Sequence, residues 1–279
     1  MTINCNGAPV DLSSPKIMGI LNITPDSFYD GGKYTKDTNI LHCVENMLGE
    51  GATFIDVGAY SSRPGADEIS VDEELRRSVA TVELIVKNFP NTLISIDTFR
   101  AKVAKENIEA GACMVNDISG GTLDADMLST VGKLNVPYIL MHMKGNPKNM
   151  QENALYHNFM RELIYFFSER IAEARAHKIN DIIIDPGFGF AKTLDQNYEL
   201  MAKLDLLHII NLPVLVGISR KSMLYKLLNT NPENALNATT SLHTVALGKG
   251  AHIVRVHDVK EAMECIKIHE MITKNRKDI

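Results

Sequence analysis

Three hydrogen-bond acceptors end short apolar segments of the chain: Asp97, Asn116 and Asp185. Segments of this kind form buried strands, so each acceptor is expected where a strand meets a loop. Carboxylate and amide oxygens in such positions suit a flat heterocycle with several N–H groups, because one carboxylate can accept two of them side by side. Buried charge-assisted hydrogen bonds are worth roughly 1.5–3 kcal/mol each, enough to select one edge of a ring. The sequence therefore predicts a pocket for a planar, N–H-rich ligand.

A second group combines cations with an amide: Asn22, Arg63, Arg255 and His257. Guanidinium groups bind phosphate oxygens in pairs, and backbone N–H groups at helix N-termini add to such a site. These residues predict an anion site built for phosphate. Magnesium in such sites is bound mainly by phosphate and water, so Asn22 could be its protein ligand. A structural metal centre is not expected, because no His and carboxylate cluster has ligand spacing.

Polar or charged groups follow every predicted strand. Besides those above, the strands lead into Ser61, Ser62, Asp117, His142, Ser219, Arg220, Lys221 and Ser222, together with the apolar Pro64 and Met141. For any single residue, a role in capping a helix or fixing a loop is an equally good interpretation. Polar or charged groups at all the strand ends together favour a functional site. His142 and His177 fit structural or solvated roles better than catalysis, and Lys221 could instead be a surface lysine at a helix start. Met141, Phe28 and Phe190 could form a pocket wall.

The strands that must position these residues are visible as eight apolar segments: Ile17–Leu21, Thr53–Val57, Leu93–Ile96, Cys113–Val115, Tyr138–Met141, Ile182–Ile184, Val214–Val216 and Ile253–Val256. Strands that are apolar on both faces and separated by helices indicate a parallel sheet. Eight such units in 279 residues predict an α/β fold, a closed (β/α)8 TIM barrel forming a single domain over residues 1–279. A doubly wound open sheet is the second possibility, but no G-x-G-x-x-G follows the first strand.

Helices between the strands have apolar residues at three- and four-residue spacing, as in the segments 40–48 and 75–89. Asp72 is predicted to cap the second of these helices. A longer helical pattern runs from Asn153 to Lys178 and is rich in Phe and Leu. It could supply extra core or a contact between subunits.

A weak internal repeat supports the barrel. The segments 51–56, 111–116 and 250–255 each read as glycine, alanine, an apolar strand and a polar residue. The glycine is expected to adopt the left-handed conformation that ends a helix. Since the three copies align without gaps, the polar residues Asp56, Asn116 and Arg255 should lie at equivalent depths in their strands.

Composition excludes several classes of protein. The chain is 45% hydrophobic with a formal net charge of -5, and its Lys and Arg residues are dispersed, so no nucleic-acid or membrane surface is indicated. Neither a membrane span nor a signal peptide is apparent, and a cytoplasmic protein is expected. Cys5, Cys43, Cys113 and Cys265 are scattered, which favours reduced packing cysteines over disulfides or a zinc site.

Seven motifs together closely resemble the dihydropteroate synthase family: G-I-L-N-I-T-P-D-S-F at 19–28, S-S-R-P-G-A at 61–66, I-D-T at 96–98, N-D-I-S-G-G at 116–121, D-P-G-F-G-F at 185–190, G-x-S-R-K-S at 217–222 and R-V-H-D at 255–258. They occur in the family's order over about residues 16–258. Any single tripeptide would be weak, but the ordered set is specific.

The resemblance implies a (β/α)8 barrel transferase of folate biosynthesis. Its small-molecule substrates would be 6-hydroxymethyl-7,8-dihydropterin diphosphate and p-aminobenzoate, its products 7,8-dihydropteroate and pyrophosphate, and it would require Mg2+ and form a homodimer. Neither nucleic acid nor membrane would be a partner. By motif, the pterin would be held by Asp97, Asn116, Met141, Asp185 and Lys221, and the diphosphate by Asn22, Arg63, Arg255 and His257, with Asn22 also on the metal. The p-aminobenzoate would contact Phe28, Ser62, Pro64, Phe190, Lys221 and Ser222.

The mechanism implied is SN1-like. Pyrophosphate leaves first, a pterin methylene cation forms near Asp97, and the arylamine then attacks; Asp97, Lys221 and Arg63 would carry the catalysis. No protein nucleophile is needed, in agreement with the absence of a Ser-His-Asp or Cys-His arrangement at the strand ends. One departure is Tyr60-Ser61-Ser62, where many relatives have Glu-Ser-Thr. It affects the arylamine pocket, although sensitivity to sulfonamides is expected because no insertion is evident from Ser61 to Ala66.

Two other functions are compatible with parts of the pattern. A related pterin-barrel methyltransferase, which uses methyltetrahydrofolate, would share the Asp and Asn set but not the Ser-Arg-Lys-Ser and Arg-x-His motifs. A non-catalytic pterin-binding protein would be expected to have lost one of Asn22, Asp97, Lys221, Arg255 and His257, and this sequence contains all five.

Overall fold

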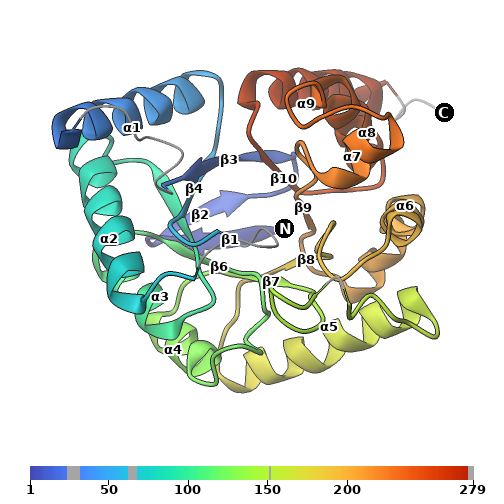
Figure 1. The fold of residues 1–279 in the computed structure, drawn as a ribbon, viewed down its shortest axis with the longest axis horizontal. Helices are drawn as coiled ribbons and strands as arrows, with labels where there is room; N and C mark the ends of the chain where they lie inside the picture. Colours follow the sequence, from blue (N-terminus) through green and yellow to red (C-terminus); the bar gives the residue numbers. More distant parts are fainter. Residues whose placement is uncertain (24–31, 62–67, 151, 276–279) are drawn as a thin grey trace.

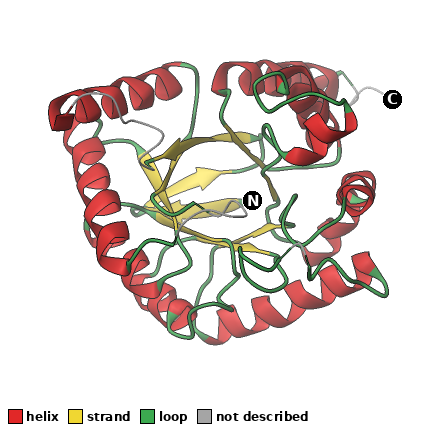
Figure 2. Cartoon of the chain, viewed as in Figure 1, coloured by secondary structure: helices red, strands yellow, loops and turns green. Residues whose placement is uncertain are grey.

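The computed structural model describes the chain except for residues 24–31, 62–67, 151 and 276–279. A ring of helices surrounds a central barrel of strands (Figures 1 and 2). The strands are β1 (Thr2–Cys5), β2 (Ala8–Asp11), β3 (Lys16–Asn22), β4 (Phe54–Gly58), β5 (Leu93–Asp97), β6 (Met114–Asp117), β7 (Tyr138–Met141), β8 (Ile182–Asp185), β9 (Leu215–Val216) and β10 (Ile253–Val256). The helices are α1 (Gly32–Gly49), α2 (Val71–Asn88), α3 (Ala101–Glu109), α4 (Met127–Leu134), α5 (Phe159–Ala176), α6 (Leu194–Ala202), the 3-10 helix η2 (Leu204–Ile210), α7 (Ser222–Leu227), α8 (Leu236–Gly248) and α9 (Val259–Lys274).

The parallel sheet confirms the predicted (β/α)8 barrel. Its strand order is β8-β7-β6-β5-β4-β3-β10-β9, and a parallel bridge between Ile184 and Val214 brings the two edges together. Each of the eight predicted segments forms one of these strands, with bounds that differ by at most two residues. Because all eight strands run in the same direction, their carboxyl ends gather at one mouth of the barrel.

Side chains point into the barrel at every second strand position, and they change character along the axis. The lowest layer is apolar and completely buried; it contains Met18, Phe54, Met114, Ile139, Ile183, Leu215 and Ile253. Two residues further along the strands, the inward positions of β4, β6, β8 and β10 are Asp56, Asn116, Asp185 and Arg255. A dry floor therefore supports a polar layer just below the mouth.

A short antiparallel hairpin, β1 and β2, closes the floor and was not predicted from the sequence. Its turn is Asn6-Gly7, and both residues have positive φ (52° and 81°), as a two-residue hairpin turn requires. Ile3, Cys5 and Leu12 pack into the apolar layer and are at most 2% exposed. The Asn-Gly pair was the available sequence signal. The hairpin lies across the middle of the ring of helices in Figure 1.

The predicted repeat is confirmed at its glycines. Gly51, Gly111 and Gly250 each follow the end of a helix with φ of 105°, 117° and 84°. The N–H groups of Gly111 and Ala112 close the end of α3: Gly111 N donates to Ile108 O, and Ala112 N donates to Asn107 O. This turn brings each helix directly back into a strand.

Two helix boundaries differ from prediction. The cap of α2 is Ser70, whose hydroxyl accepts from Glu73 N at 3.1 Å, so the prediction of Asp72 as the cap was wrong. Asp72 instead lies in the first turn, where its negative charge interacts favourably with the helix dipole. The helix predicted from Asn153 begins only at Phe159, because Asn158 caps it by accepting from Arg161 N.

The cysteines are free thiols: Cys5, Cys113 and Cys265 are buried and Cys43 is half-buried. No helix in the described part of the chain is both long and apolar enough to cross a membrane.

His243 on α8 makes folding sensitive to acid. The side chain is buried, and neither ring nitrogen has a hydrogen-bond partner among the described residues. Burial lowers the pKa of His243 from 6.5 to about 4, against the nearby charge of Asp258. Between these values the unfolded chain holds a proton that the folded chain does not, so stability falls as the pH falls through this window. We expect this residue to reduce the free energy of unfolding by about 2 kcal/mol at pH 5 relative to pH 8.

The measurement is urea unfolding at pH 5 and pH 8 for the native chain and for His243→Leu. Other groups titrate in both proteins. The informative quantity is therefore the change in free energy of unfolding between pH 8 and pH 5, compared between the native chain and His243→Leu. The same pH dependence in both proteins would contradict the assignment.

Candidate functional site

One row of the barrel wall joins four predicted or neighbouring site positions. Asn22, Gly58, Asp97 and Asn116 are successive partners in register across β3, β4, β5 and β6. A side chain at Gly58 would place its first carbon 3.5 Å from Asn22 Oδ1 and 3.6 Å from Asp97 Oδ2. The glycine therefore leaves one shared space in front of the amide and the carboxylate, as a ligand bound by both would require.

Arg255 connects the two groups that the sequence predicted. Its Nε donates to Asp56 Oδ2 at 2.6 Å and its Nη2 to Asp97 Oδ2 at 2.7 Å. Asn116 Nδ2 also donates to Asp56 Oδ2, at 2.9 Å. The equal depth predicted for Asp56, Asn116 and Arg255 is thus confirmed by direct hydrogen bonds. Asp56 was predicted as part of the repeat but not as a site residue.

The charges of this cluster are strongly coupled. Burial raises the pKa of Asp97 from 3.8 to about 7; Arg255 opposes this shift, whereas Asp56 adds to it. Burial disfavours the charge of Arg255, but the carboxylates of Asp56 and Asp97 prevail and raise its pKa. Asp97 therefore changes charge near neutral pH while Arg255 stays a cation.

Asp185 ends β8 beneath a tight loop. Its Oδ1 accepts from Gly187 N at 2.7 Å. Burial raises the pKa of Asp185, and the cations of Lys221, Arg255 and Lys192 oppose that shift. Met141 is its partner in register on β7 and is 3% exposed, packed with Ile118, Met143, Met150 and Ala191. This apolar group lies beside Asp185, and the role of Met141 in a pocket wall stays a prediction.

Lys221 lies at this mouth as a half-buried residue that immediately precedes α7. Its Nζ donates to Phe188 O at 2.5 Å and lies 4.6 Å from the centre of the Phe190 ring. Burial lowers the pKa of Lys221 to about 8, although Asp185 favours the charged form. Ser222 follows as the first residue of α7. Phe190 and Lys221 thus lie in contact, with Ser222 next in the chain, and their predicted contact with p-aminobenzoate stays a prediction.

A buried lysine, Lys192, supports the loop that contains Phe190. Its Nζ donates to Gly187 O at 2.9 Å and Phe190 O at 3.0 Å and lies 3.0 Å from His142 Nδ1. Burial lowers the pKa of both Lys192 and His142 well below their usual values. His142 is therefore structural, as predicted. Lys192 was missed, since a lone lysine after a glycine-rich loop carries no burial signal.

The residues after β9 and β10 form the opposite rim. Ser219 Oγ accepts from His257 N at 3.2 Å and lies 3.0 Å from His257 Nδ1, which orients the exposed imidazole. Arg220 binds both oxygens of Asp258 at 2.8 Å and donates to the carbonyl oxygens of Pro232 and Glu233. Arg220 thus fixes the loop before Lys221.

Two other strand-end positions have structural roles. Asp117 accepts from Ser119 N, Gly121 N and the Tyr138 hydroxyl at 2.6–2.7 Å, so it fixes the β6 loop. Tyr60 packs edge-on against Phe99 with ring centres 5.1 Å apart. The residues Phe28, Ser62, Arg63 and Pro64 lie outside the described part of the chain, and their predicted roles stay predictions.

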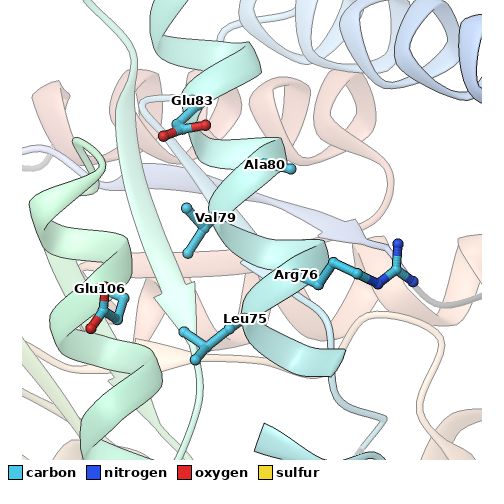
Figure 3. Close-up of a pocket in the computed structure, with 6 residues that line it drawn as sticks. All are labelled: Leu75, Arg76, Val79, Ala80, Glu83 and Glu106. Atoms are coloured by element: carbon cyan, nitrogen blue, oxygen red, sulfur yellow. The ribbon is translucent and has the colours of Figure 1, made fainter. Parts of the chain in front are cut away.

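A shallow hollow on the outside of the barrel is not this site. It has a volume of about 340 Å3 and lies between α2 and α3 (Figure 3), lined by Leu75, Arg76, Val79, Ala80, Glu83 and Glu106. Arg76 is paired with Glu73 at 2.7 Å. The hollow is separate from the strand ends, where the buried carboxylates and cations converge.

The fold and the acceptor cluster define the pterin-binding class of barrels, and residues 18–257 match the family described as pterin binding enzyme. The chain is 43% identical to the dihydropteroate synthase of Escherichia coli K12 over 272 residues, which cover 97% of this chain and 96% of that protein. It is 41% identical to the Synechocystis enzyme over 259 residues, covering 92% and 89%. The chain belongs to the dihydropteroate synthase family.

Solved structures of dihydropteroate synthases are similar to this chain over nearly its full length. The Yersinia pestis dihydropteroate synthase with a sulfonamide drug complex has a TM-score of 0.92 and 43% identity, covering 98% of this chain and 100% of that one. The Xanthomonas albilineans enzyme with 4-aminobenzoic acid has a TM-score of 0.91 and 35% identity, with 98% of both chains covered.

Proposed function

We propose that this chain joins 6-hydroxymethyl-7,8-dihydropterin diphosphate to p-aminobenzoate, giving 7,8-dihydropteroate and pyrophosphate. The observation that carries the proposal is Arg255, which is bonded to Asp56 and Asp97 at the end of an acceptor row. One cation therefore borders both a ring pocket and an anion site. A bond broken at that border would have its developing positive charge near Asp97 and its leaving anion near Arg255.

The proposed contacts follow from these positions. Asp97, Asn116, Asp185, Lys221 and Met141 would bind the pterin, and Phe190, Lys221 and Ser222 the p-aminobenzoate. Asn22, Arg255 and His257 would bind the diphosphate. Of the residues outside the described part, Arg63 would join the diphosphate site, and Phe28, Ser62 and Pro64 the p-aminobenzoate site.

In the proposed reaction the bond between the pterin methylene carbon and the diphosphate oxygen breaks first, and its electron pair leaves with pyrophosphate. The carboxylate of Asp97 stabilises the resulting cation, and the guanidinium of Arg255 stabilises the leaving anion. The arylamine nitrogen then donates its lone pair to the methylene carbon and releases a proton to solvent. Phe190 and Lys221 would hold the arylamine for this attack.

Magnesium is proposed as the cofactor, and the residues present fit it. Asn22 offers an amide oxygen at the anion side of the row, and no group of three His, Cys, Asp or Glu residues that could hold a metal exists in the described part of the chain. This donor set suits a hard cation bound mainly by phosphate. When bound, Mg2+ would neutralise charge on the diphosphate.

We propose a homodimer through one side of the barrel. Exposed apolar side chains occur on α7, α8 and α9, helices that lie together at one corner of Figure 1: Leu227, Val245, Ile268, Met271 and Ile272, each 42–61% exposed. Neighbouring exposed apolar residues of this kind commonly mark an interface. Light scattering after gel filtration should give twice the chain mass of 30.9 kDa; a monomer at micromolar concentration would contradict it.

A cytoplasmic location is also proposed, consistent with the four free cysteines.

The deciding experiment is pyrophosphate release by purified protein with Mg2+ and the pterin diphosphate, with and without p-aminobenzoate. Release that depends on p-aminobenzoate, with dihydropteroate as the product, would support the synthase. Tight binding of the pterin diphosphate without turnover would favour a non-catalytic pterin-binding protein. Methyl transfer from methyltetrahydrofolate to a corrinoid would favour the methyltransferase. A sulfonamide should inhibit the synthase reaction competitively with p-aminobenzoate.

A further inference from the structure

Asp56 occupies a position between the apolar floor and the mouth of the barrel. On β4 it follows Phe54, which belongs to the floor, and precedes Gly58, which is the register partner of Asn22 and Asp97. Its side chain is completely buried. A ligand resting on the row of Asn22 and Asp97 would therefore lie above Asp56, in contact with the side chains that Asp56 holds.

The first of these side chains is Asn116. Its Nδ2 donates to Asp56 Oδ2 at 2.9 Å, and the residue is 4% exposed. An ionised carboxylate only accepts hydrogen bonds, so Asn116 must turn its NH2 group toward Asp56. Its Oδ1 is then directed elsewhere as a fixed acceptor. A site with this acceptor discriminates between ligands that present N–H and ligands that present C=O at the same place.

The second is Arg255. Asp56 Oδ2 holds Nε at 2.6 Å, close to the root of the guanidinium, while Asp97 holds Nη2 at 2.7 Å. Gly217 lies beside the stem, since a side chain there would begin 3.8 Å from Arg255 Cβ, in ordinary van der Waals contact. With Nε and one N–H of Nη2 engaged, the other guanidinium N–H groups remain for an anion. The same carboxylate oxygen thus orients a ring acceptor and an anion donor.

We propose that Asp56 is a positioning residue that sets both the hydrogen-bond pattern of the ring pocket and the direction of the Arg255 guanidinium, without contacting substrate. The idea rests on the proposed pterin chemistry of this site. Asp56 Oδ1 is buried and has no hydrogen-bond partner within the described residues, so this carboxylate is held in place through Oδ2 alone. Removing its charge should release the Asn116 amide to rotate and present its NH2 group to the ligand.

The test compares binding of 6-hydroxymethylpterin with 6-hydroxymethyllumazine, which has C=O where the pterin has its 2-amino group. The native protein should prefer the pterin. In Asp56→Asn the ratio of the two dissociation constants should fall about tenfold, because Asn116 can then donate to the lumazine oxygen. Equal weakening of both ligands would show a merely structural role and overturn the proposal, as would an unchanged ratio.

Ser95 provides a matched control. It is the register partner of Asp56 on β5, is completely buried, and has an unpartnered Oγ among the described atoms. It bonds neither Asn116 nor Arg255 in the described structure, so Ser95→Ala should keep the native preference. A tenfold change in this control as well would overturn the assignment to Asp56.

A measurement on the native protein covers the case in which Asp56→Asn does not fold. The Nε–H signal of Arg255 in a 15N spectrum, identified by its loss in Arg255→Lys, should exchange slowly with water both with and without ligand. Rapid exchange would overturn the proposal. If the native protein binds neither pterin nor lumazine, the proposed function fails, while the exchange measurement still decides whether Asp56 anchors Arg255.

Discussion

Asp97→Asn is expected to lower kcat by about 10²–10³-fold while changing pterin affinity only a few-fold, since it removes a charge that acts mainly on the cationic transition state. Asn keeps an oxygen acceptor of the same size at the end of β5, so binding of the ring survives. The loss of negative charge also weakens the hold of Asp97 on Arg255, now fixed at 2.7 Å, but the bond from Asp56 to Nε remains.

The pH profile gives an independent readout of the same substitution. Burial raises the pKa of Asp97 to about 7 and lowers that of Lys221 to about 8. If the reaction needs the carboxylate of Asp97 and the ammonium of Lys221, kcat/KM should rise with pH through about 7 and fall above about 8. Asp97→Asn should lose the acidic limb and keep the alkaline one.

Asp205→Asn is the matched control, because that exposed carboxylate pairs with Lys249 on the outer surface. It should leave kcat and the profile unchanged. Equal losses of turnover and pterin affinity in Asp97→Asn would contradict a selective role in the transition state. An acidic limb that persists in this variant would assign the titration to another group.

Arg255→Met should destabilise the fold by about 3–5 kcal/mol, because it removes the cation from between Asp56 and Asp97. Asp56 is completely buried, so solvent cannot replace the guanidinium without rearrangement. The variant should also bind pyrophosphate more weakly. Urea unfolding of both proteins measures the first effect, and calorimetric titration with Mg2+ and pyrophosphate measures the second.

The sign of the pH dependence makes this prediction specific. The pKa of Asp97 is already raised in the folded protein, and loss of the cation should raise it further. A carboxyl whose pKa is raised in the folded state contributes fully to stability below its unfolded pKa, near 3.8, and loses that contribution as the pH rises through its folded pKa. The difference in free energy of unfolding between the native protein and Arg255→Met should therefore be larger at pH 8 than at pH 5.

Two substitutions calibrate this result. Arg76→Met removes an exposed arginine paired with Glu73 on α2 and should leave the urea midpoint nearly unchanged. Arg255→Lys keeps the charge but not the planar donor pair, so it should recover part of the stability and little of the pyrophosphate affinity. A pH-independent difference in Arg255→Met would point to lost packing as the cause.

Local pattern was sufficient to predict the architecture. Each strand of the barrel is a short apolar segment bounded by glycine or polar residues, and helices such as α2 and α3 have a one-sided apolar face; both signals lie within a few residues of the chain. The three glycine-alanine copies even predicted that Asp56, Asn116 and Arg255 lie at one depth, which their hydrogen bonds confirm. Motif order, which is also read along the chain, was enough to predict the family.

The tertiary structure decided which of these side chains touch. Arg255 is 199 residues from Asp56 and 158 from Asp97, and only closure of the barrel brings β10, β4 and β5 to a common mouth. Burial of Lys192 follows from the same closure, because a side chain becomes inaccessible only when several strands and loops converge on it. Sequence patterns report the preferences of neighbouring residues, whereas these contacts and their charges depend on how distant segments pack.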